Sequence, residues 1–242
     1  MLIRHLSFDL WLTLIKSNPV FKIKRAEYFF NKYNPHKIEL IQLKQLIHEI
    51  DKKCDDYNEK TGTKVPVTLM YSMILTALGS SVELITEEIL NHIKFNIDSL
   101  FLDFKPFLLN EKVKITIENL KNDGYKLNLA SNTGFIEGNV IINVLNELDL
   151  YDYFDFFIFS DEIGASKPSA FFYDCVYDKL KNNMNKNEVM HIGDNYYADF
   201  LGAIHYGFQA LHICEQQFTY YDIIKEINER NYKSERLQNT GS

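Results

Sequence analysis

Residues 5–14 have the sequence HLSFDLWLTL, in which a short apolar run ends on a carboxylate. A run of this length and composition predicts a buried β-strand with Asp9 at its carboxyl end. Ligands of open α/β sheets bind outside the carboxyl ends of the strands. Because an unpaired carboxylate is costly to bury, we expect a cation or a hydrogen-bond donor beside Asp9. A helix cap or a turn residue would look the same in isolation, so the rest of the chain has to decide.

Three later segments have a related design. Residues 126–133, KLNLASNT, form a second apolar run that ends on hydroxyl and amide side chains. Residues 166–169, SKPS, place a single lysine before a proline at the start of a predicted helix. Residues 189–194, VMHIGD, form a third apolar run that ends on a carboxylate, and Asp199 follows it. Each segment therefore carries a reactive or charged side chain at or just beyond a strand end.

This ordered set of Asp, Ser, Lys and paired Asp residues resembles the four motifs of the haloacid dehalogenase-like (HAD) superfamily. The resemblance extends over residues 1–15 and 105–213. It implies an α/β fold, namely a Rossmann-like doubly wound parallel sheet core with an all-helical cap domain. One position departs from the phosphatase pattern DxDxT, because Trp11 stands where the second Asp is expected.

Composition limits the possible functions. The chain has 242 residues, 46% of them hydrophobic and 14% aromatic, which favours a folded globular protein over a disordered one. Its net charge of −7 argues against a general nucleic-acid-binding protein, which needs a basic face. We expect no nucleic-acid partner, and the sequence leaves the oligomeric state open.

Cysteine usage and apolar runs indicate the compartment. The three cysteines have no CxxC spacing, and we expect buried, reduced thiols. Arg4 and His5 interrupt the first apolar residues, so no signal peptide is predicted. No apolar run approaches the roughly 20 residues of a membrane span. These observations predict a cytoplasmic protein with no membrane partner, in which His5 and His191 are core histidines.

Strand-type and helix-type patterns alternate over the first and last parts of the chain, which indicates a parallel sheet covered on both faces. We predict strands at residues 2–8, 125–130, 156–160, 189–192 and 208–213, and helices at residues 110–122, 136–148, 170–182, 195–206 and 220–230.

Residues 16–104 differ, because they contain helical patterns only, at residues 21–33, 38–57, 67–78 and 82–97. An all-helical block inserted after the first strand predicts a separate domain, which the resemblance identifies as a cap over the active site. The predicted core domain comprises residues 1–15 and 105–233, the cap residues 16–104, and a flexible tail residues 234–242.

The resemblance also assigns a metal and a nucleophile. Asp9 is the expected nucleophile, because a carboxylate can form an aspartyl-phosphate. Mg²⁺ is the expected cofactor, since it prefers oxygen ligands. Its protein ligands would be the carboxylates of Asp9 and Asp194 and the backbone carbonyl of Trp11. Asp199 would bind the metal through a water molecule or contact the residues that bind it.

The remaining expected site residues contact the substrate. Ser131 and Asn132 would hold the phosphoryl oxygens, and Lys167 would place a positive charge where the transition state is most negative. Thr13 is a further expected substrate-binding residue. In the cap, the expected contacts are Lys22 and Arg25, which belong to a basic cluster with Lys24. A solvated helix face would also explain this cluster.

The leading hypothesis is a Mg²⁺-dependent phosphatase or phosphotransferase for a small phosphorylated metabolite. A 2-haloacid dehalogenase is the first alternative, because its leaving halide needs no proton and the enzymes tolerate an aromatic residue at the position of Trp11. Against it, those enzymes lack a metal carboxylate at the position of Asp194. A phosphonatase-type enzyme would need a cap lysine of strongly lowered pKa, and a pseudophosphatase would bind a ligand or a partner without turnover.

Overall fold

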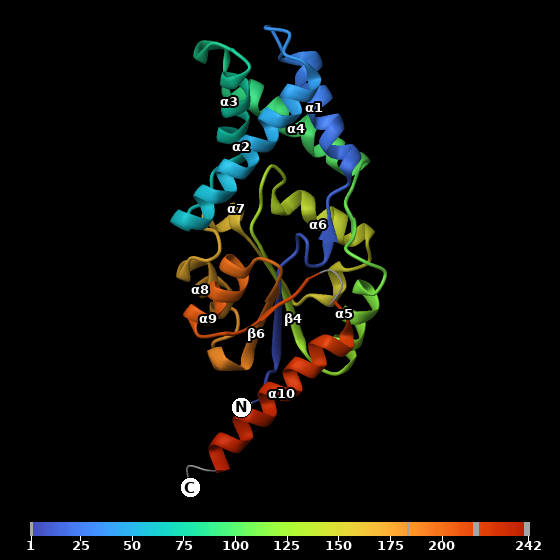
Figure 1. The fold of residues 1–242 in the computed structure, drawn as a ribbon, viewed down its shortest axis with the longest axis vertical. Helices are drawn as coiled ribbons and strands as arrows, with labels where there is room; N and C mark the ends of the chain where they lie inside the picture. Colours follow the sequence, from blue (N-terminus) through green and yellow to red (C-terminus); the bar gives the residue numbers. More distant parts are fainter. Residues whose placement is uncertain (1, 183, 215–217, 240–242) are drawn as a thin grey trace.

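The computed structural model describes residues 2–182, 184–214 and 218–239, the last seven of these by their backbone alone. Five strands form one parallel sheet in the order β5-β4-β1-β6-β7, which confirms the predicted doubly wound α/β core (Figure 1). The strands are β1 (His5–Phe8), β4 (Lys126–Ser131), β5 (Phe156–Phe159), β6 (Val189–Gly193) and β7 (Gln209–His212).

Strand β1 lies at the centre of the sheet and is fully buried. Its last residue, Phe8, is aligned with Leu129 of β4 and with Ile192 of β6. The chain order reverses at β1, since β4 and β6 lie on its two sides. This arrangement makes the carboxyl end of β1 the topological switch point of the sheet, where doubly wound folds bind ligands.

Helices cover both faces of the sheet (Figure 1). Apolar side chains of α5, α6 and α10 pack with those of the sheet in one core cluster, and those of α8 and α9 pack in a second cluster on the other face. The bounds are α5 (Val113–Asn122), α6 (Gly138–Glu147), α8 (Ala170–Asp178), α9 (Gly202–Tyr206) and α10 (Tyr220–Asn239). Shorter elements are η2 (Tyr151–Tyr153), α7 (Ser160–Ile163), η3 (Lys186–Glu188) and η4 (Tyr196–Leu201).

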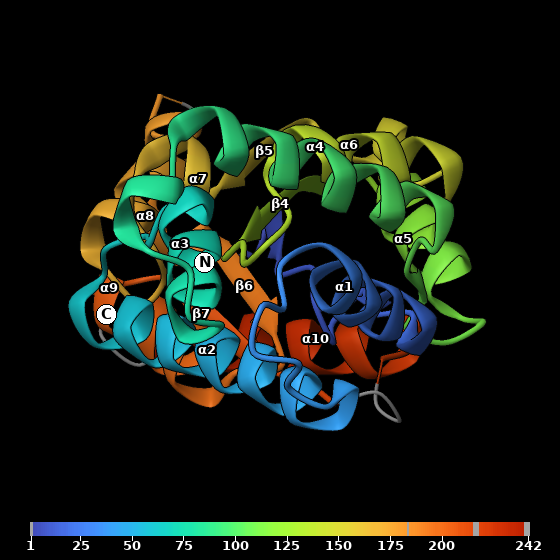
Figure 2. The ribbon, with the colours of Figure 1, turned by 90° about the horizontal axis from the view of Figure 1, so that it is seen from above.

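The inserted segment is all-helical and lies beyond the carboxyl edge of the sheet (Figures 1 and 2). Two short antiparallel strands, β2 and β3, pair where the chain leaves the core and where it returns. The elements are β2 (Ile15–Lys16), α1 (Pro19–Lys32), α2 (Leu40–Thr61), α3 (Val67–Ala77), η1 (Val82–Leu84), α4 (Glu87–Asp103) and β3 (Phe107–Leu108). We call the segment from α1 to α4 the cap.

Helix α2 is amphipathic, and its apolar face packs in the core of the cap. Leu43, Ile47, Ile50 and Cys54 recur at helical spacing and are buried in the cap core. The helix ends at Gly62, whose φ of 71° is left-handed. A Cβ at this glycine would lie 2.6 Å from Cβ of Ser169 in the core domain, so the close approach of the two parts also requires glycine here.

Several predicted elements differ from the structure. Residues 195–206, predicted as one helix, form the π-helix η4 followed by the short helix α9. Helix α10 continues to Asn239, so most of the predicted flexible tail is helical, while residues 240–242 lie outside the described residues. The cysteines are free, but Cys214 is exposed, so the expectation of three buried thiols is wrong. None of the helices, as far as they are described, is long and apolar enough to cross a membrane.

Candidate active site

Parallel pairing brings three strand ends together beneath the cap. Asp9 follows β1, Ser131 ends β4, and Asp194 follows β6. The amide of Asp9 donates to the carbonyl of Ile192 at 2.9 Å, so the backbone pairing with β6 extends to the carboxylate itself. The side chains at these strand ends therefore share one edge of the sheet.

Lys167 is the centre of the charge network. Its Nζ lies 2.7 Å from Oδ1 of Asp9 and 2.7 Å from Oδ1 of Asp199, and it donates to the carbonyl of Ala130 at 2.7 Å. Only 1% of its surface is exposed. The backbone of Lys167 is fixed by the Asn132 side chain, which accepts from its amide at 2.8 Å and donates to its carbonyl at 3.1 Å. One ammonium thus joins two buried carboxylates from different segments.

Asp199 has two hydrogen-bond partners besides Lys167 within the described residues. Its Oδ2 accepts from the amide of Asn195 at 3.0 Å, and its Oδ1 lies 3.2 Å from Nε2 of His191. The other ring nitrogen of His191 lies 3.0 Å from Oγ of Ser7. A Cβ at Gly193 would lie 2.3 Å from Oδ2 of Asp199, so only glycine leaves room for this carboxylate. The π-helical turn after β6 places Asp199 here, and π-turns are frequent at functional sites.

Burial and shared charge separate the three carboxyl groups. Burial raises the pKa of Asp9 to about 7, with Lys167 opposing the rise and Asp199 adding to it. Burial and the neighbouring Asp199 raise the pKa of Asp194 to about 6. Burial alone would also raise the pKa of Asp199, but Lys167 and His191 outweigh it and hold this pKa below its usual range. Lys167 therefore compensates Asp199 more fully than Asp9 or Asp194, whose negative charges are costly in this site.

The residues present fit a hard divalent cation. One carboxylate oxygen from each of Asp9, Asp194 and Asp199 lies within 4.8 Å of the others. Both oxygens of Asp199 already accept hydrogen bonds, whereas Asp194 accepts a long one of 3.5 Å from Oγ1 of Thr13. Within the described residues, Asp9 and Asp194 are therefore less fully engaged by hydrogen-bond donors than Asp199, and carboxylate oxygens of this kind suit Mg²⁺.

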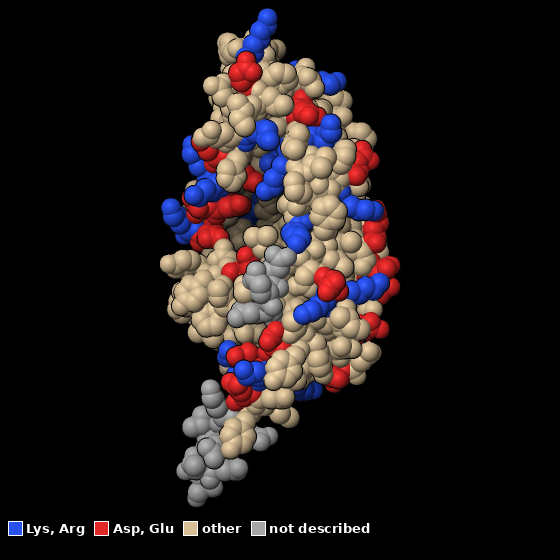
Figure 3. Space-filling view, turned by 45° about the vertical axis from the view of Figure 1, so that its right-hand side comes forward, with Lys and Arg blue, Asp and Glu red and all other residues tan. Residues whose placement is uncertain are grey.

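A cavity of about 510 Å³ lies between the core and the cap, above these carboxylates. Basic and acidic side chains both border the hollow between the two parts (Figure 3). The lining residues from the sheet side are Asp9, Trp11, Leu12, Lys16, Asn132, Thr133, Gly134, Phe135, Ile136, Lys167, Asp194, Asn195, Ala198 and Asp199. Those from the inserted segment are Ser17, Phe21, Lys22, Arg25, Asp51, Asp55, Asn58, Glu59 and Phe101.

Trp11 contributes a wall of the cavity. Its indole packs edge-on against Phe101 of α4 at 6.2 Å between ring centroids, and Phe101 packs against Phe21 of α1 at 5.3 Å. The turn that carries Trp11 is tight, with Leu12 at a left-handed φ of 58°. The side chain that replaces the second Asp of the phosphatase pattern therefore lies at the junction of the site and the cap.

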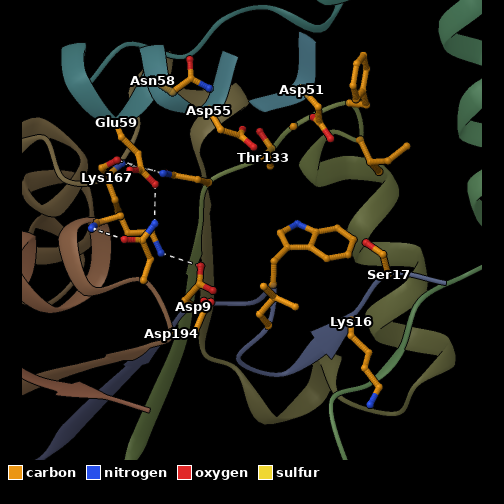
Figure 4. Close-up of a pocket in the computed structure, with 18 of the residues that line it drawn as sticks. Asp9, Lys16, Ser17, Asp51, Asp55, Asn58, Glu59, Thr133, Lys167 and Asp194 are labelled. Carbon is orange, nitrogen blue, oxygen red and sulfur yellow. Dashed lines mark hydrogen bonds and ion pairs between the residues drawn. The ribbon is translucent and has the colours of Figure 1, made fainter. Parts of the chain in front are cut away.

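The cap adds three acidic side chains to the cavity. Asp51, Asp55 and Glu59 are spaced four residues apart on a face of α2 that adjoins its apolar stripe, and Figure 4 shows them pointing from the helix toward the strand ends. Oε1 of Glu59 accepts from Nδ2 of Asn195 at 2.5 Å, which joins α2 directly to the loop after β6.

Lys22 and Arg25 of α1, the two cap residues expected to contact the substrate, both line the cavity. Lys22 is exposed, whereas Arg25 is buried, with its guanidinium 4.3 Å from the ring centroid of Phe135. Lys24 instead pairs with Glu27 at 2.8 Å on the helix surface. The buried lysine of the cap, Lys64, does not line the cavity, although burial lowers its pKa.

Not every predicted residue reaches the cavity. Ser131 is fully buried, and its Oγ donates to the carbonyl of Asn132 at 3.1 Å rather than lining the space above Asp9. Thr13 is equally buried and contacts Asp194. In this structure both hydroxyls support the loops of the site. The backbone of Trp11 lies in the turn after Asp9, where the sequence predicted a ligand.

Sequence reasoning missed other residues of the site. His191 was expected in the core and is buried there, but it also orients Asp199. Asp51, Asp55 and Glu59 were missed because surface acids on a helix carry no distinctive signal. Their common spacing of four residues, on a helix face that adjoins an apolar stripe, is the pattern that could have shown them.

Comparison with known proteins identifies the family of the chain. Residues 6–213 match the model of the family described as haloacid dehalogenase-like hydrolase. The chain therefore belongs to that family and is a HAD-like hydrolase with an α/β core and a helical cap.

Individual relatives differ in their chemistry. The chain is 24% identical over 193 residues to (S)-2-haloacid dehalogenase 2 from Pseudomonas sp. (strain CBS-3), covering 72% of this chain and 80% of the relative. The structure resembles the magnesium-bound putative HAD-hydrolase YfnB from Bacillus subtilis, with a TM-score of 0.66 and 16% identity over 88% of this chain and 89% of the other. It also resembles a putative beta-phosphoglucomutase from Thermotoga maritima, with a TM-score of 0.62 and 20% identity over 86% and 84%. At these identities the two structures show a shared fold.

Proposed function

We propose that this hydrolase is a Mg²⁺-dependent phosphatase or phosphotransferase that acts on a small phosphorylated metabolite through an aspartyl-phosphate at Asp9. The observation that supports it best is Asp194. This carboxylate lines the cavity beside Asp9, forms no ion pair within the described residues, and has its pKa raised to about 6 by burial and by Asp199. A dehalogenation site has no need of such a group, whereas a metal site does.

Asp9 and Lys167 would perform the first step. An oxygen of Asp9 attacks the phosphorus, the P–O bond to the leaving group breaks, and the electron pair leaves on that oxygen. Lys167, held 2.7 Å from Asp9, neutralises the charge of the incoming phosphoryl oxygens. Mg²⁺ held by Asp9 and Asp194 would neutralise further negative charge when bound. Water then attacks the phosphorus of the aspartyl-phosphate, which releases inorganic phosphate and restores Asp9.

Trp11 determines which leaving groups suit the enzyme. Indole cannot protonate a leaving oxygen, since its N–H does not titrate in this range. General acid catalysis is worth roughly 10²–10⁴ in rate. Acyl and aryl phosphates, whose leaving groups need little protonation, should therefore be better substrates than alkyl phosphates. Lys22 and Arg25 of the cap are the proposed contacts for the rest of the substrate.

A 2-haloacid dehalogenase is the second candidate. The relative from Pseudomonas and the aromatic residue at Trp11 favour it, because a halide leaves without a proton. Asp9 would attack carbon in that case, and the site would work without metal. Asp194 is the residue that this alternative leaves unexplained.

One assay separates the two candidates. Phosphate release from acetyl phosphate and from an aryl phosphate, with Mg²⁺ and with EDTA, should be metal-dependent and absent in Asp9→Asn. Chloride release from 2-chloropropionate is measured in parallel. Chloride release that persists in EDTA, with no phosphate release in Mg²⁺, would replace the proposal by the dehalogenase.

A further inference from the structure

Arg25 is the most unusual charged residue of the cavity. Only 6% of it is exposed, and its guanidinium lies between the rings of Phe135 at 4.3 Å and Phe21 at 5.6 Å. Its Nε has no hydrogen-bond partner, and no carboxylate lies within salt-bridge distance among the described residues. Burying a guanidinium without an anion is costly, so this side chain has unused capacity for an anionic ligand.

The carboxylate of Asp51 on α2 lies near Arg25, and Asp55 follows one helical turn further along. Asp51 is the acidic residue whose charge most affects Arg25, and a Cβ on Gly134 would lie 3.5 Å from its Oδ1. Asp51 therefore lies against the same core loop that carries Phe135. Neither Asp51 nor Asp55 forms a salt bridge in the part of the chain that the structure describes. Burial and the neighbouring Asp51 raise the pKa of Asp55 to about 7, and the positive charge of Lys64 offsets only part of this rise.

The position of these groups makes them a second site in one cavity. Asp51 and Asp55 lie on the cap side, whereas Asp9 and Asp194 lie at the strand ends on the other side (Figure 4). A ligand whose phosphoryl group is held at Asp9 and Lys167 would extend toward the cap. Its far end would then meet an anion-binding guanidinium and two cation-binding carboxylates together.

We infer that the cap side of the cavity, formed by Arg25, Asp51 and Asp55, binds a zwitterionic group that carries a carboxylate and an ammonium. The inference rests on the proposed function and narrows its substrate to phosphorylated amino acids or compounds of the same charge pattern. The carboxylate pairs with Arg25, and the ammonium lies between Asp51 and Asp55. A ligand with one of the two charges would leave the opposite protein group unpaired.

Binding of phosphonates tests this without turnover, because their C–P bond is not a phosphoester. Four matched compounds are titrated into the full chain by calorimetry, with and without Mg²⁺. They are 2-amino-4-phosphonobutyrate (both charges), 4-phosphonobutyrate (carboxylate only), 3-aminopropylphosphonate (ammonium only) and propylphosphonate (neither). Since one charge-assisted hydrogen bond contributes roughly 1.5–3 kcal/mol, the first should bind about tenfold or more tightly than each of the others.

Single substitutions test which protein residue binds the carboxylate of the ligand and which binds its ammonium group. Arg25→Gln should remove the advantage given by the carboxylate, and Asp51→Asn the advantage given by the ammonium, while both leave propylphosphonate affinity unchanged. Asp56→Asn, on the same helix but outside the cavity lining, is the matched control and should change nothing. The affinities of the wild-type protein for the four phosphonates test the zwitterion site even if the Arg25 variant does not fold.

The outcomes separate this inference from the proposed function. Equal affinity for all four phosphonates, with Mg²⁺-dependent binding, would overturn the zwitterion site and keep the phosphoryl site. Preference for 4-phosphonobutyrate over the amino acid would also overturn it. Binding of no phosphonate in Mg²⁺ would remove the phosphoryl site and the inference together.

Discussion

Replacing the nucleophile should make the metal-free protein more stable. Burial raises the pKa of Asp9 to about 7 from its ordinary 3.8. At pH 8 the unfolded chain and the folded protein both ionise this group, but the folded protein does so at a cost of roughly 4 kcal/mol at most. Asp9→Asn removes that charge and keeps an oxygen that can accept from Lys167. We expect the free energy of unfolding in EDTA to rise by about 1–4 kcal/mol at pH 8, while turnover is lost.

The pH dependence gives the sign of this effect. A carboxyl group whose pKa is raised on folding stabilises the folded state at low pH, and that stability is lost as the pH rises through the folded value. The gain from Asp9→Asn should therefore be larger at pH 8 than at pH 5. Thermal unfolding in EDTA measures it, with roughly 2–4 °C expected for each kcal/mol in a chain of this size.

The stability of a control variant at pH 8 should change in the opposite direction. Asp155 pairs with Lys121 at 2.8 Å and accepts from the amide of Leu127, and these contacts outweigh desolvation and lower its pKa. Asp155→Asn should lower the melting temperature at pH 8. If Asp9→Asn also lowered the melting temperature in EDTA at pH 8, or kept wild-type phosphate release, the description of Asp9 as a nucleophile whose buried charge destabilises the metal-free protein would be wrong.

Three further predictions concern the same site. Because the pKa of Asp194 is raised to about 6, its carboxyl group becomes negatively charged as the pH rises past that value. Mg²⁺ should therefore raise the melting temperature more at pH 8 than at pH 5. Equal shifts at both pH values, or an unchanged shift in Asp194→Ala, would contradict Asp194 as a ligand. Lys167→Met leaves two buried carboxylates without their shared cation and should cost about 3–5 kcal/mol in urea unfolding; a loss below 1 kcal/mol would show that water already solvates them. Trp11→Asp should speed alkyl phosphate hydrolysis by roughly 10²-fold or more; fast wild-type hydrolysis that the substitution does not improve would show that another group supplies the proton.

The sequence was sufficient for the core but not for the cap side of the site. Asp9 and Asp194 follow apolar strands, and Lys167 directly precedes the proline at a helix start; the parallel sheet aligns the strand ends, so these local signals also place the residues in the fold. The inward face of α2 was missed, since Asp51 and its neighbours on that helix are ordinary exposed residues until the cap is placed over the sheet. The direction of the Ser131 hydroxyl was also beyond the sequence, because a rotamer is chosen by its tertiary neighbours.

The pairing of β2 with β3 has a consequence for how this chain can vary. Ile15 is aligned with Leu108, so the inserted segment starts and ends at the same place on the core. The inserted segment is therefore a loop whose two ends are fixed together on the core, and each doubling of the length of such a loop costs only about 0.6 kcal/mol more in closure entropy. The core can therefore accept insertions of very different length at this point for nearly the same cost. Changes of substrate could then arise by exchanging the insertion as a unit while the residues that perform the reaction stay in place.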